Sequence, residues 1–129
     1  LRSRGLGDVY KRQYLHYKES SDLTPVIPIN ATSCYSMFAH CENLWILDLS
    51  SFNTENIKNF SYMFSGCENL YHIDVSDKWN TDAAITADNV FEDCYRLPHY
   101  RDGRTGLEMC CSVNEGGYFH YVGEEDDYE

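Results

Sequence analysis

Six cysteines and five histidines are the side chains of this 129-residue chain with the most reactive chemistry. Thiolates and imidazoles bind zinc, and a thiolate beside an imidazole can act as a nucleophile. The cysteines lack the C-x-x-C spacing of zinc sites, and the histidines are scattered, with only His40 next to a cysteine, Cys41. Phosphate-binding and nucleophile-elbow motifs are missing as well. The sequence therefore predicts no metal, no cofactor and no enzymatic activity.

Three of the cysteines, Cys41, Cys67 and Cys94, recur at intervals of 26 and 27 residues. The residues around them recur too, as SMFAHCENLWILDLSSFNT, YMFSGCENLYHIDVSDKWNT and NVFEDCYRLPHY. A unit repeated at such a period is a supersecondary element that stacks on its copies and shares a core with them. The sequence therefore predicts an α/β repeat solenoid of about three rungs.

Each unit contains two patterns of apolar residues. Residues 34–41 and 60–67 carry apolar side chains at i, i+3, i+4 and i+7, which is typical of the buried face of a helix. Residues 44–50 (LWILDLS) and 70–76 (LYHIDVS) alternate as a strand does. We therefore expect a short helix followed by a short strand in each rung.

Stacking should bring equivalent side chains into inward-facing columns, with the phenyl groups of Phe38, Phe64 and Phe91 lying together. Apolar side chains repeated in this way are expected to form the core rather than a cofactor site. The predicted core comprises Met37, Phe38, Cys41, Leu44, Leu47, Leu49, Met63, Phe64, Cys67, Leu70, Ile73, Val75, Val90, Phe91, Cys94 and Leu97.

The column of cysteines leaves two alternatives open. Stacked residues lie about 5 Å apart, a distance that overlaps the Cα separation of disulfides, about 4.4–6.8 Å. Three cysteines cannot all pair, however, and free cysteine packs well as a small buried hydrophobe. The pattern favours buried thiols, whereas Cys110 and Cys111 could bond elsewhere or stay free.

The formal net charge of −11 argues against a nucleic-acid partner, because phosphate binding requires clustered Lys and Arg.

Residues 1–13 fall outside the repeat pattern and contain four of the ten basic residues. They resemble translated sequencing adaptor, and a basic disordered arm is the alternative. Residues 123–129 are expected to form an acidic disordered tail. No apolar stretch is long enough to span a membrane.

The units closely resemble the repeats of BspA-type leucine-rich-repeat surface proteins. The shared pattern is MF, a Cys three residues later, L-x-x-L-D-L-S and then F-(D or N)-T, and it extends from about Pro28 to Tyr100. NEGGYFHY is similar to the segment that often closes such arrays. The resemblance implies an N-terminal edge segment at 14–27, a leucine-rich-repeat-like solenoid at 28–97 and a C-terminal cap at 98–122. The third copy departs from the pattern, since LPHY replaces L-D-L-S.

The resemblance also implies a function and a location. BspA-like proteins are mostly exported bacterial surface proteins, and several are linked to adhesion, so this fragment is expected at the cell surface or secreted, although it contains no signal peptide. Its partner would be a host matrix or cell-surface protein or a glycan. Outward strand residues are the candidate contacts: Trp45, Ile46, Asp48, Tyr71, His72 and Asp74.

Two of these residues have an alternative role, because Asp48 and Asp74 can instead accept backbone N–H bonds from the following turn. Two functions also remain open. The first is a non-enzymatic binding module whose repeat face meets a protein or glycan. The second is an architectural spacer or capping segment of a longer surface protein, with no ligand of its own.

Overall fold

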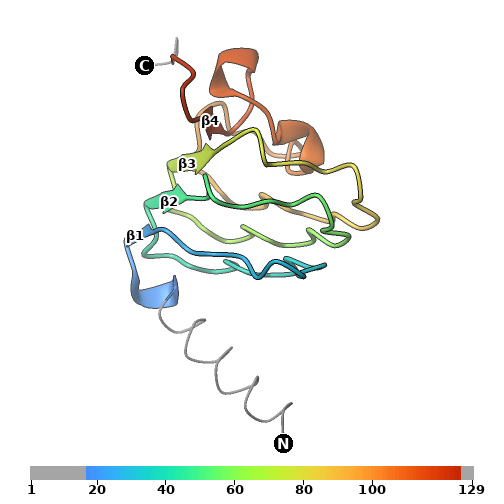
Figure 1. The fold of residues 1–129 in the computed structure, drawn as a ribbon. Helices are drawn as coiled ribbons and strands as arrows, with labels where there is room; N and C mark the ends of the chain where they lie inside the picture. The colour runs from blue at the N-terminus through green and yellow to red at the C-terminus, as the bar shows by residue number, and fades with distance from the viewer. Residues whose placement is uncertain (1–16, 126–129) are drawn as a thin grey trace, which may run out of the picture.

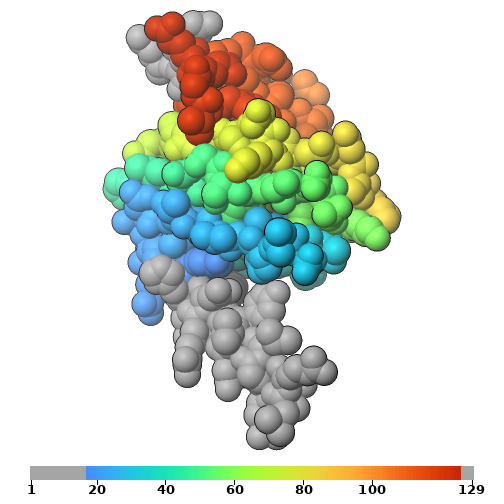
Figure 2. Space-filling model, in the orientation of Figure 1, coloured from blue at the N-terminus to red at the C-terminus, as the bar shows by residue number. Residues whose placement is uncertain are grey.

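The computed structural model describes residues 17–125, and the predicted leader at 1–13 lies outside them. Four short strands form one parallel sheet in the order β1 (Asp22–Leu23), β2 (Ile46–Asp48), β3 (His72–Val75) and β4 (His120–Tyr121). The strands lie one above another from the N-terminal to the C-terminal end (Figure 1). Successive parts of the chain therefore form successive layers, which are also visible on the surface (Figure 2).

The register of the sheet matches the sequence repeat. Leu47 lies opposite Ile73 and Asp48 opposite Asp74, so that each residue faces its equivalent 26 positions along the chain. The side chains of Leu47 and Ile73 point into the core, and their neighbours along each strand are half-buried on the other side. The repeat in the sequence is thus also a repeat in space.

The expected helices at 34–41 and 60–67 are wrong, because both segments are runs of turns. Ser36 and His40 have positive φ angles of 53° and 60°, and Tyr62 and Gly66 repeat this at 59° and 79°. A right-handed helix cannot continue through such residues. The apolar spacing that predicted a helix is also compatible with this chain of turns.

A second hydrogen-bond ladder replaces the helical bonds. The N–H groups of Ser36, Phe38 and His40 donate to carbonyls of the next unit, at 2.7–2.9 Å. Alternate N–H groups, such as that of Met37, close turns within their own unit. The same alternation links residues 60–66 to the third unit. Turns on one side and strands on the other therefore both bind neighbouring units together, which is how these layers satisfy their backbone groups.

The predicted column of phenyl rings is confirmed. The ring centroids of Phe38 and Phe64 lie 5.9 Å apart and those of Phe64 and Phe91 lie 5.1 Å apart, with nearly parallel planes. All three rings are fully buried. Every other residue of the predicted core is buried too, except Met37, which is half-buried and packs against the edge of the core.

Residues 98–122, the predicted C-terminal cap, pack against the third unit with irregular structure. The cap contains two short 3₁₀ helices, η1 (Leu107–Met109) and η2 (Val113–Glu115), followed by β4. Tyr118 and Phe119 are fully buried, and their rings pack edge-to-face on Phe91. The third repeat contributes no strand to the sheet, because β4 from the cap pairs directly with β3. The eroded LPHY segment is thus bypassed.

Two segments outside the predicted array contact the rest of the fold. The segment at 14–27, expected only as an edge, contributes β1 and places Leu23 in the core opposite Leu47. At the other end, Glu124 accepts hydrogen bonds from Ser112 Oγ and Asn114 Nδ2. The start of the predicted tail is therefore attached to the cap, and residues 126–129 lie outside the described part.

None of the helices in residues 17–125 has the length and apolar character needed to cross a membrane.

Candidate functional site

The outer side of the sheet displays polar side chains, because alternate residues of each strand point away from the core. These positions are occupied by three aspartates, two histidines and one isoleucine. They are Asp22, Ile46, Asp48, His72, Asp74 and His120. Four of the six were candidate contacts from the sequence, whereas Asp22 and His120 were missed because their strands have no full repeat around them.

Two exposed aromatic side chains, Trp45 and Tyr71, stand directly before β2 and β3. Their exposed fractions are 51% and 39%, and their ring centroids lie 6.5 Å apart in an edge-to-face arrangement. The N–H groups of Tyr71 and His72 both donate to the carbonyl of Trp45. This irregularity at the start of β3 leaves the consecutive side chains of Tyr71 and His72 accessible. The rings of Trp45 and Tyr71 therefore remain on the surface beside the outer strand positions.

A row of rings continues from this pair across the sheet. Tyr71 and His72 have ring centroids 6.5 Å apart, and His72 stacks on His120 with centroids 3.9 Å apart. The aromatic side chains of Trp45, Tyr71, His72 and His120 therefore form one continuous surface, which we call the ring row. His120 belongs to it because the cap supplies β4, a pairing that no repeat in the sequence indicated.

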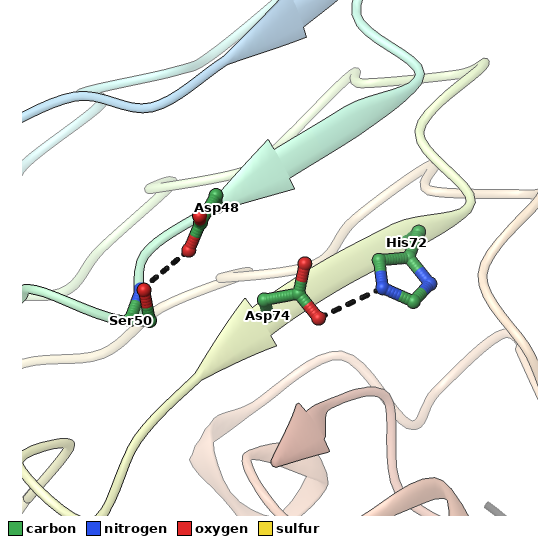
Figure 3. Close-up of polar contacts among 4 residues, drawn as sticks. All are labelled: Asp48, Ser50, His72 and Asp74. Atoms are coloured by element: carbon green, nitrogen blue, oxygen red, sulfur yellow. Dashed lines mark hydrogen bonds and ion pairs between the residues drawn. The ribbon is translucent and has the colours of Figure 1, made fainter. Parts of the chain in front are cut away.

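The two aspartates at equivalent positions make different contacts (Figure 3). Asp48 Oδ1 accepts the backbone N–H of Ser50 at 2.9 Å, which confirms the alternative role predicted for it. Asp74 Oδ1 instead lies 2.8 Å from His72 Nε2. For Asp74 the turn-capping prediction is wrong, because the imidazole two residues earlier on the same face takes its place as hydrogen-bond partner.

Two buried thiols donate to backbone carbonyls of the preceding unit. Cys67 Sγ donates to the carbonyl of Phe38, and Cys94 Sγ donates to that of Phe64, each at 3.0 Å. All six cysteines are free, and Cys34, Cys41, Cys67 and Cys94 are buried. Burial raises the pKa of Cys34 from 9.0 to about 12 and also raises the pKa of Cys94. A buried thiol with a raised pKa is a poor nucleophile, because the thiolate is the reactive form.

A second aromatic pair borders a shallow hollow on the turn segments. The rings of Tyr35 and Tyr62 lie 5.9 Å apart, and Ser36, His40 and Ser65 contribute to the lining. This hollow was not predicted, since Tyr35 and Tyr62 do not occupy equivalent positions of the repeat. Within residues 17–125 no group of three or more His, Cys, Asp or Glu side chains is arranged to hold a metal ion.

Comparison with known proteins gives a family but no activity. Residues 22–101 match the family described as Mycoplasma protein of unknown function, DUF285. The chain belongs to the DUF285 family. The match begins at β1 and ends after the third repeat, so the DUF285 region includes the first three strands, whereas η1, η2 and β4 follow it. No curated protein and no solved structure matches the chain.

Proposed function

We propose that this DUF285 chain is a non-enzymatic binding module that presents the outer side of its sheet to a protein or glycan partner. The observation that carries the proposal is the exposed pair Trp45 and Tyr71 beside the outer strand positions. Large aromatic side chains bury much area at low entropic cost when a partner covers them. They are costly to leave in water, so their adjacency at the surface favours an interface.

The scaffold suits such a role. We propose that the layers form a short leucine-rich-repeat-like solenoid, supported by the parallel register of β2 on β3 and by the phenyl column. Each layer is held by backbone bonds and by buried side chains, so outward residues can vary without disturbing the core. A rigid surface also binds with little loss of conformational entropy.

Family resemblance supports a proposal for the location and the kind of parent protein. The DUF285 family is associated with BspA-like repeat proteins. We therefore propose that the chain is part of a bacterial leucine-rich-repeat surface protein of the BspA type, exposed at the cell surface or secreted. In this setting a host matrix protein, a cell-surface protein or a glycan would be the partner.

Surface plasmon resonance on the immobilised chain tests this function, with purified matrix proteins and oligosaccharides as analytes. We expect saturable binding of at least one analyte, and its loss in the double variant Trp45→Ala/Tyr71→Ala. The control, Tyr35→Ala/Tyr95→Ala, removes two tyrosines that are 58% and 55% exposed outside the outer strand positions, and should bind as the wild type does. Equal binding by both double variants would contradict the assignment, and absence of binding would favour the spacer.

A further inference from the structure

The outer strand positions of the sheet have one sign of permanent charge. Asp22, Asp48 and Asp74 provide three carboxylates among the six positions, and none of the six is Lys or Arg. Asp22 is exposed, and the side chains of His72 and Asp74 are 30% and 31% exposed. The chain as a whole carries a formal charge of −11. The electrostatic field therefore attracts cations to this face.

The ring row adds a second attraction for cations. Guanidinium and ammonium groups bind over the faces of Trp and Tyr rings, most strongly when water is partly excluded. The pair Trp45 and Tyr71 connects through His72 to the carboxylate of Asp74, by contacts of 6.5 Å, 6.5 Å and 2.8 Å. Aromatic faces and carboxylates are thus adjacent on one surface, and a cationic side chain could contact both.

The spacing of the rings indicates the shape of the ligand. The centroids of Trp45 and Tyr71 are 6.5 Å apart. In an extended peptide, side chains at i and i+2 point the same way and are about 6.6 Å apart. A segment with basic residues at alternate positions can therefore place one cation at each ring.

Resting on the proposed function, we propose that the partner is a protein with an extended cationic segment, whose alternate Arg or Lys side chains lie on Trp45 and Tyr71 beside Asp48 and Asp74. Charge complementarity favours this occupant over a glycan. A neutral sugar can donate hydroxyl groups to these carboxylates but has no positive charge to complement them, and an acidic sugar would be repelled by them.

Fluorescence anisotropy with two synthetic peptides tests the proposal. The first alternates Arg with Gly, and the second replaces each Arg by citrulline, which has nearly the same shape but no charge. At about 150 mM NaCl, where exposed charges are screened beyond roughly 8 Å, we expect the Arg peptide to bind and the citrulline peptide not to bind. A third peptide, with the same number of Arg residues in one block, should bind more weakly.

Charge-preserving variants distinguish this site from general attraction of a polycation. Trp45→Ala/Tyr71→Ala leaves the net charge unchanged and should weaken binding about tenfold or more. Trp45→Phe/Tyr71→Phe keeps the rings and should recover a measurable part of the affinity. Asp48→Asn/Asp74→Asn keeps a hydrogen-bond acceptor at each position and should weaken binding and reduce its dependence on salt. Tyr35→Ala/Tyr95→Ala should bind like the wild type.

Thermal melting of each variant verifies that it is folded. The proposal is overturned if the citrulline peptide binds equally, if Trp45→Ala/Tyr71→Ala has no effect, or if the control double variant loses as much affinity. Binding of an oligosaccharide that requires Trp45 and Tyr71, without binding of the Arg peptide, overturns the cationic partner but leaves the binding module intact. Failure of every matrix protein, oligosaccharide and peptide to bind overturns both.

Discussion

Phe64 is packed against aromatic rings on several sides. Its ring stacks between those of Phe38 and Phe91 and meets Phe119 edge-to-face with centroids 6.5 Å apart. It is fully buried, and layers on both sides limit how far the surroundings can move into an empty space. The free energy of packing is therefore concentrated here, because an interior of native density has little room to relax.

We predict that Phe64→Ala lowers the free energy of unfolding by about 3–5 kcal/mol, through lost burial and a residual cavity. Urea unfolding followed by circular dichroism measures the change. Ile29→Ala provides the control, since Ile29 is 92% exposed and its truncation should change stability by less than about 0.5 kcal/mol. Similar unfolding midpoints for the two variants would show that Phe64 does not hold the layers together.

The cysteine column illustrates how far residue identity can be interpreted from sequence. Repetition of Cys41, Cys67 and Cys94 indicated one buried position per unit, and these side chains are buried. The thiol bonds from Cys67 and Cys94 to the carbonyls of Phe38 and Phe64 could not be inferred, because they depend on the turn geometry. Cysteine fits this position because its side chain is small and its S–H group is a weak donor. A purely apolar residue would fill the space but would not donate a hydrogen bond to the carbonyl.

At the scale of elements, β2 and β3 were predictable, whereas β1, β4 and the turn segments were not. Period-two alternation at 46–48 and 72–75 indicates a strand directly. At 34–41 the apolar spacing is typical of a helix. The sequence signal against a helix is the type of residue at two positions of the repeat. His40, Gly66 and Asp93 all have positive φ, as do Ser36, Tyr62 and Asn89. Gly, Asp, Asn and His tolerate that region best, but each is common elsewhere too.

The candidate site shows the same division. Trp45, Tyr71, Asp48 and Asp74 could be chosen from the repeat, since alternation places strand residues on a given face. His120 could not, because β4 pairs with β3 across 46 positions and skips the third unit. Long connections to a cap leave no periodic trace in the sequence. The ring row is therefore visible only once the cap is in place.

The C-terminal cap contains two adjacent glycines that serve different purposes. Gly116 has a φ of 86° and open space where a Cβ would stand, so it is needed for its backbone angle. At Gly117 an added Cβ would collide with the backbone carbonyl of Cys111. That carbonyl accepts the N–H of Phe119 at 3.0 Å, which positions the buried ring against Phe91.

We predict that Gly117→Ala destabilises the protein more than Gly116→Ala. Gly116→Ala should lower the free energy of unfolding by about 1 kcal/mol, because it places a non-glycine residue at positive φ. Gly117→Ala instead forces backbone groups apart and displaces Phe119 from the core. Thermal melts of the two variants provide the comparison. Hydrogen exchange at the amide of Phe119 should rise sharply only in Gly117→Ala, and equal effects of the two substitutions would contradict the close approach.

At the scale of the whole molecule, charge opposes the packing that holds the layers together. The chain has 21 acidic and 10 basic residues, and acidic side chains occur in every layer from Asp22 to Glu124. Like charges confined to a compact shape repel more strongly than in the unfolded chain. The excess of negative charge that would attract a cationic partner therefore also lowers the stability of the free protein.

We predict that the melting temperature rises by about 2–6 °C between low salt and 0.5 M NaCl, as screening reduces this repulsion. Sodium chloride is preferable to sulfate, because sulfate also strengthens burial of apolar surface. The cationic peptide should raise the melting temperature at low salt by binding the folded state, and this effect should shrink as salt increases. A melting temperature that falls with NaCl would mean that attractive ion pairs outweigh repulsion, and the electrostatic argument for a basic partner would lose its basis.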